Sequence, residues 1–246
     1  MAVGAIVLPF GALASRQEHP MTTPRTLLAR TFLALTLGVA MVLVCYFIVD
    51  RPVAWFVHNH RFFPQRLLLW PPLVSRGMKT LAPLGIIAAV VWWAWRPGGR
   101  LQTVLLAISA DLVAITAIKL LLKWGCGRTW PESWPENHPS LIADGVYGFH
   151  PFHWGAAYDS FPSGHAAVIC SVAWILWMGY PRWCWWCAAA CLLPCAALVG
   201  MNYHFVGDVV AGVILGCVTG AWVARLFRVD IPSAPGAACV AGRTPT

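Results

Sequence analysis

The sequence predicts an all-α, polytopic membrane protein: a bundle of six transmembrane helices, with an interfacial segment between the first two spans. Two observations predict this class. Of the 246 residues, 59% are hydrophobic and only 11% are charged, whereas charged residues make up about a quarter of an ordinary soluble domain. The hydrophobic residues also gather in runs of the length, about 20 residues, that a helix needs to cross a bilayer.

Six apolar runs are long enough to be spans, and they lie near 29–49, 79–95, 101–122, 164–180, 183–201 and 205–227. Between the first two, residues 51–78 contain four arginines and several aromatic residues, so we expect this segment to lie in the membrane interface. Residues 124–162 form a long hydrophilic loop. We therefore predict one membrane domain over 29–228, between disordered tails at 1–28 and 229–246.

The net charge of +8 is carried by basic residues that flank the apolar runs. Such residues contact anionic headgroups, and no basic patch with interleaved aromatic residues indicates nucleic-acid binding. Six spans place both termini on one side, where a slight excess of arginine predicts the cytoplasm. The long loop would then face the periplasm, from a bacterial inner membrane. The sequence gives no signal for an oligomeric state.

The nine cysteines do not indicate a disulfide framework or a metal centre. Four of them lie at helical spacing inside one apolar run, which is typical of small buried thiols in a packed helix; they are Cys184, Cys187, Cys191 and Cys195. We predict no metal site and no cofactor.

Two histidine motifs stand at the starts of apolar runs. Ser163, Gly164 and His165 open the fourth run, where the unpaired amides of a first helical turn and the helix dipole favour an anion. His204 and Asp208 open the sixth run, and their spacing of four puts both side chains on one helical face. A carboxylate beside an imidazole fixes its tautomer, as a nucleophilic or basic histidine requires.

Two cations follow the third run, and they complete a set of groups that suits phosphoryl chemistry without a metal. Lys123 supplies a point charge and Arg128 a planar fork. Each motif also has a structural interpretation: an ordinary helix cap, a buried polar pair, or basic anchoring beside the membrane. Asp111 and Lys119 share one face of the third run, and for them we expect a structural role rather than catalysis.

The order of these motifs resembles the membrane branch of the type 2 phosphatidic acid phosphatase superfamily. The resemblance implies that His204 attacks phosphorus to form a phosphohistidine and that Asp208 orients His204. His165 would protonate the leaving oxygen and then activate water. It also implies that the phosphoryl oxygens are held by four groups, namely Lys123, Arg128, Ser163 and the amide of Gly164.

Two positions depart from the family pattern. Trp130 and Leu198 stand where the family has arginine, and we expect Arg128 to take over one of the missing roles, with His150, His153 or an interfacial arginine as alternatives. The aromatic segment around His153 is interpreted either as a lid over the site or as an interfacial belt.

The leading functional hypothesis is a metal-independent phosphatase acting on a membrane lipid phosphate or diphosphate. One alternative is a phosphotransferase of the same fold, which passes the phosphoryl group to a second lipid. The other is a non-catalytic lipid-binding or transport protein, which the missing arginines favour and the retained histidines oppose.

Overall fold

The computed structural model describes residues 24–60, 77, 84–85, 87–88, 91–92, 99–132, 138–153 and 155–229. In these ranges the regular secondary structure is helical, apart from three isolated β-bridges in the loop after residue 126. The prediction of an all-α membrane fold is confirmed.

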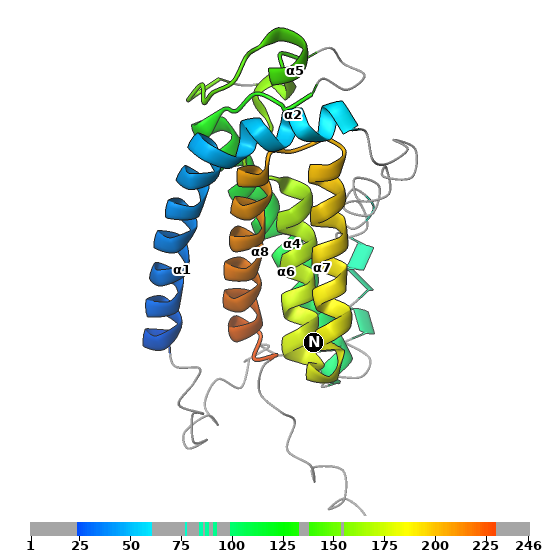
Figure 1. Ribbon diagram of the computed structural model, residues 1–246. Helices are drawn as coiled ribbons and strands as arrows, with labels where there is room; N and C mark the ends of the chain where they lie inside the picture. The colour runs from blue at the N-terminus through cyan, green and yellow to red at the C-terminus, as the bar shows by residue number, and fades with distance from the viewer. Residues whose placement is uncertain are drawn as a thin grey trace, which may run out of the picture.

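The first helix, α1, spans Pro24–Val44 and continues through a π-helical turn, Cys45–Val49, into α2 at Asp50–His60. Helix α2 lies across the end of the bundle (Figure 1). The remaining long helices are α4 (Arg100–Cys126), α6 (Gly164–Gly179), α7 (Cys184–Gly200) and α8 (Val206–Leu226). Short helical turns occupy Leu141–Asp144 (α5), Ala156–Tyr158 and Pro181–Trp183.

The described helices agree with five of the predicted spans. Four segments are long and apolar enough to cross a membrane, namely Pro24–His60, Arg100–Cys126, Pro181–Gly200 and Val206–Leu226, and the shorter apolar helix Gly164–Gly179 accompanies them. The predicted span at 79–95 lies mostly outside the described residues, so the count of six stays a prediction. Helix α1 begins at residue 24 rather than 29, so the helix includes the end of the predicted N-terminal tail.

The interfacial position of residues 51–78 stays a prediction, although the first part of this segment is helical. Helix α2 covers its start and turns away from the direction of α1 (Figure 1), while most of residues 61–78 lie outside the described ranges. Helices α6 and α8 begin at the end of the bundle that α2 crosses, whereas α1 begins and α8 finishes at the opposite end. This arrangement agrees with the expected alternation of the spans.

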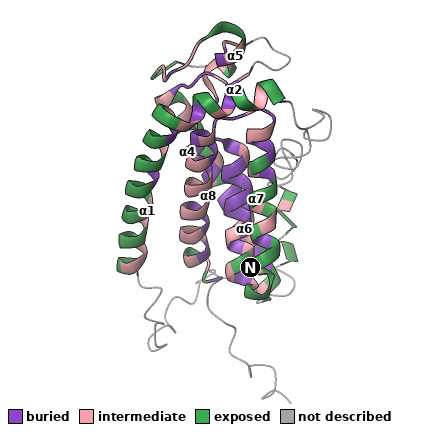
Figure 2. Cartoon of the chain, in the orientation of Figure 1, coloured by how far each residue is buried: buried purple, intermediate pink, exposed green. Residues whose placement is uncertain are grey.

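The core is centred on α6, which is buried along most of its length (Figure 2). Helix α8 approaches it through glycines spaced four residues apart, Gly212, Gly216 and Gly220. A Cβ atom added to Gly216 would lie 2.4 Å from the carbonyl oxygen of Ala167. Small residues at this spacing let the backbones of membrane helices touch. The contact fixes the start of α6 beside the start of α8.

Candidate active site

Two imidazoles meet where α6 and α8 begin. His165 is in the first turn of α6 and His204 lies two residues before α8, and their ring centroids are 5.8 Å apart. The backbone links the same two places, because the N–H of Ser163 donates to the carbonyl of Asp208 at 2.9 Å. His165 is partly exposed, whereas His204 is only 2% exposed. The pair is therefore open to its surroundings on the side of His165.

The ring of His204 is held between a carboxylate and aromatic neighbours. Its Nδ1 is 3.6 Å from Oδ2 of Asp208. Its Nε2 is buried and has no hydrogen-bond partner among the described residues. Burial lowers the pKa of His204, and the Asp208 carboxylate opposes that shift only in part. The lowered pKa favours the neutral imidazole, which has a lone pair on one ring nitrogen.

The Asp208 carboxylate is itself fully buried and fixed by three donors. Ser160 Oγ donates to Oδ2 at 2.6 Å and the N–H of Phe205 donates to the same oxygen at 3.1 Å, while Arg128 Nη1 donates to Oδ1 at 2.6 Å. Hydrogen bonds to an ionised carboxylate favour its charged form. Asp208 therefore faces His204 as a rigid anion.

Arg128 does not occupy the place that the sequence suggested. Its guanidinium is completely buried, with Nη1 on Asp208 and Nη2 on Asp50 at 2.6 Å, and Nη2 also contacts the Tyr147 hydroxyl at 3.0 Å. Burial alone would lower the pKa of Arg128, but the two carboxylates outweigh it and raise the pKa. Arg128 stays charged and is neutralised by protein groups. Direct contact with a phosphoryl group, as we expected from the sequence, does not fit this geometry.

Asp50 is the part of this network that the motifs did not reveal. It is 1% exposed at the start of α2, and it accepts the N–H of Gly207 at 2.9 Å as well as the Arg128 bond. The signal for it in the sequence is weak: an aspartate at the end of an apolar run, followed by arginine and proline. Asp50, Arg128 and Asp208 thus form one buried chain of charges from α2 to α8.

Lys123, by contrast, is only half-buried and faces the imidazoles. Its Nζ donates to the carbonyl of Asp159 and lies 5.9 Å from the centroid of Trp130. The Trp130 ring is 5.3 Å from that of His204. The C-terminal turn of α4 sets this position, because Gly127 adopts a φ of 52° and its N–H donates to the carbonyl of Lys123 at 2.8 Å.

Ser163 and Gly164 are where the sequence predicted, at the start of α6. Ser163 Oγ accepts the N–H of Ala166 at 3.4 Å, so its helix cap is present, and both residues are buried. Ser163 and Gly164 therefore form the start of α6 directly before His165.

The two positions that depart from the family pattern carry uncharged, well-packed side chains. The Trp130 ring lies beside that of His204 at an interplanar angle of 38°, and its Nε1 donates to the carbonyl of Ala156 at 2.8 Å. Leu198 is completely buried, and its carbonyl accepts the N–H of His204 at 3.2 Å. Both residues shape the loop that carries His204.

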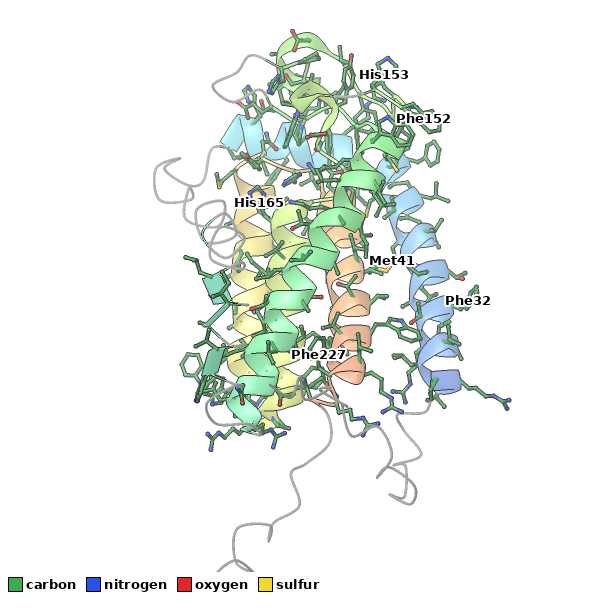
Figure 3. All side chains as sticks on the ribbon, turned by 180° about the vertical axis from the view of Figure 1, so that it is seen from behind. Phe32, Met41, Phe152, His153, His165 and Phe227 are labelled. Atoms are coloured by element: carbon green, nitrogen blue, oxygen red, sulfur yellow. The ribbon has the colours of Figure 1, made fainter. Side chains whose placement is uncertain are left out.

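The aromatic loop lies beyond the helix ends. His150 and His153 each place their ring 5.1 Å from that of Tyr158. Figure 3 shows Phe152 and His153 at the outer edge of this loop, with His165 nearer the bundle. The side chain of Phe152 is 68% exposed. These ring contacts lie within the loop. The two interpretations of the loop, as a lid or as an interfacial belt, both stay predictions.

Residues 102–231 match the family model of the PAP2 superfamily, and this match covers more than half of the chain. The chain belongs to the PAP2 superfamily. Two relatives of this PAP2 protein are lipid A 1-phosphatases: that of Rhizobium etli is 30% identical over 101 residues, 39% of this chain and 38% of the relative. That of Rhizobium johnstonii is 29% identical over 114 residues, 44% of this chain and 40% of the relative.

The matched part thus covers about two fifths of the length of these curated relatives. Among solved structures, the PAP2 protein is similar to a transmembrane PAP2 type phosphatidylglycerolphosphate phosphatase from Bacillus subtilis. The identity is 16% and the TM-score 0.42, over 82% of this chain and 98% of the other.

Proposed function

We propose that this PAP2 protein is a phosphatase that removes phosphate from a membrane lipid phosphate or diphosphate through a phosphohistidine on His204, without a metal. The observation that carries the proposal is the pair of imidazoles, 5.8 Å apart, with a buried carboxylate behind one of them. The lipid A 1-phosphatases among its relatives support a lipid phosphate as substrate.

In the first step, Nε2 of His204 attacks phosphorus in line with the bond to the lipid oxygen. The P–N bond forms, the P–O bond breaks, and His165 gives its proton to the departing oxygen. Asp208 stabilises the positive charge that develops on the His204 ring, since its Oδ2 is 3.6 Å from Nδ1. Lys123 and the amides of the first turn of α6 meet the charge on the phosphoryl oxygens.

In the second step, His165, now neutral, takes a proton from water. The resulting hydroxide attacks phosphorus, the P–N bond breaks, and inorganic phosphate leaves with His204 restored. Both steps need His165 and His204 in contact with one phosphorus atom, which suits groups on two neighbouring helix starts.

The position of the site suits a substrate that arrives within the bilayer. The histidines lie at the starts of the apolar helices α6 and α8, where a headgroup would stand. We infer that this end faces the periplasm of a bacterial inner membrane and that both termini are cytoplasmic. Reporter fusions at the C-terminus test this: cytoplasmic fluorescence supports the orientation, and activity of a fused periplasmic enzyme contradicts it.

Phosphate release from phosphatidate, phosphatidylglycerol phosphate, a polyprenyl diphosphate and lipid A, measured in detergent with a chelator present, tests the function. We expect release by the wild type and loss in both His165→Ala and His204→Ala. The matched control is His60→Ala, which removes an exposed imidazole at the end of α2. Acid-labile radiolabel on the wild type, absent from His204→Ala, would identify the intermediate.

The remaining outcomes separate the alternatives. Transfer of the label to an added lipid without free phosphate would indicate the phosphotransferase. A folded protein that turns over none of these lipids, with or without added divalent metal, would exclude the phosphatase and leave a binding protein.

A further inference from the structure

The charged residues discussed so far do not balance the negative charge of a phosphomonoester bound at the imidazoles. Arg128 is neutralised by Asp50 and Asp208, and the three groups together carry one negative charge. Lys123 cancels that charge, so the sum is zero before the proton that His165 gives to the leaving oxygen is counted. A phosphomonoester carries a charge of about −1.5 to −2 near pH 7. Because His165 gives up its proton to the leaving oxygen, a further fixed cation would stabilise the phosphoryl group beside Lys123 and the helix amides.

Helix α4 places a second lysine at the site. Leu112 and Ile115 pack against α6 as part of the buried core, and Lys119 follows them at helical spacing on the same face. The pattern of this face calls for an apolar residue at 119, yet the residue is a lysine that is 8% exposed. A buried charge within a membrane bundle is costly and is commonly retained for function.

The ammonium of Lys119 lies against the first turn of α6. A Cβ atom added to Gly164 would lie 3.5 Å from Lys119 Nζ and 3.2 Å from its Cδ. The absence of a side chain at Gly164 is therefore what admits the lysine. Gly164 is directly before His165, whose ring is 5.8 Å from that of His204, so the ammonium lies beside the helical turn that carries His165.

We propose that Lys119 is a phosphoryl-binding residue, which supplies from α4 one of the charges that Trp130 and Leu198 do not provide. The inference rests on the proposed function, since it names a further group of the same site. It differs from our expectations from the sequence, which gave Lys119 a structural role rather than a catalytic one and assigned phosphate binding to Arg128. With Lys119 included, the groups counted above carry one net positive charge before the substrate enters.

Binding of inorganic phosphate, measured by calorimetry on the purified protein in detergent, tests the inference without turnover. We expect Lys119→Met to weaken binding at least about tenfold, the effect of losing one charged hydrogen bond. Lys119→Arg, which keeps the charge, should retain most of the affinity. The control is Arg182→Met, which removes the same charge from an exposed position at the far end of α6 and should leave binding unchanged.

Each outcome decides the matter. Equal affinity in the wild type and Lys119→Met, or no phosphate binding by the wild type, overturns the role of Lys119. If the methionine variant does not fold, Lys119→Gln keeps polarity without charge, and the same loss is expected. The phosphatase proposal fails separately: a wild type that binds phosphate through Lys119 and hydrolyses no lipid would contradict the activity while supporting the binding site.

Discussion

Asp50 offers the sharpest test of the buried charge network, because no motif pointed to it. Replacing it with alanine removes the acceptor of two bonds, one from Arg128 Nη2 at 2.6 Å and one from the N–H of Gly207 at 2.9 Å. Both donors are completely or nearly completely buried, so no solvent takes the place of the lost carboxylate.

The expected loss of stability depends on which charged partners Arg128 keeps after the substitution. Breaking a buried ion pair by removing one partner costs about 3–5 kcal/mol, and Arg128 keeps its second carboxylate, Asp208. We therefore expect Asp50→Ala to lose about 3 kcal/mol, the lower end of that range. Arg128→Met leaves two buried carboxylates without a counter-charge, so we expect about 5 kcal/mol, the upper end. Every 1.4 kcal/mol is about tenfold in the folding equilibrium.

Equilibrium unfolding in mixed micelles measures these free energies. The control is Asn59→Ala, a polar truncation at an exposed position of the same helix, which should change stability by no more than about 0.5 kcal/mol. The double variant of Asp50 and Arg128 should lose less stability than the sum of the two single variants. The reason is that Arg128→Met alone leaves the Asp50 carboxylate unpaired, whereas the double variant no longer contains that carboxylate. A loss below about 1 kcal/mol in Asp50→Ala would refute the network as a source of stability.

Three further predictions follow from the same structure. Burial lowers the pKa of His204 below its usual 6.5, so the folded state prefers the neutral ring. The contribution of this ring to stability is therefore present above about pH 6.5 and is lost as the pH falls. Unfolding measured at several pH values should show a smaller fall in the free energy of unfolding at acid pH for His204→Asn than for the wild type. A side chain at Gly216 would meet the carbonyl of Ala167 at 2.4 Å. Gly216→Val should therefore destabilise the bundle by about 1–3 kcal/mol and lower activity. An unchanged melting temperature would argue against the close approach of α6 and α8. Leu198→Arg, which restores the family residue, should fail to fold or lose stability because position 198 is completely buried in an apolar cluster; a stable, more active variant would show that the site has room for this guanidinium.

The class of the fold could be predicted from local properties alone. A run of about 20 apolar residues has few alternatives to a membrane helix, and the predicted starts at 101, 164, 183 and 205 lie within one residue of α4, α6, α7 and α8. The histidine motifs were visible for a similar reason, because polar residues at the start of an apolar run stand out against it.

Only the tertiary structure decided what the cations do. A sequence shows that Arg128 and Lys119 are charged, but the partner of a charge is set by which helices meet. Asp50 lies 78 residues from Arg128 along the chain, and α2 brings it to the guanidinium, while the absence of a side chain at Gly164 admits Lys119 to the first turn of α6. Apolar length determines that helices form, and the packing of α2, α4, α6 and α8 determines which charge faces the site and which supports it.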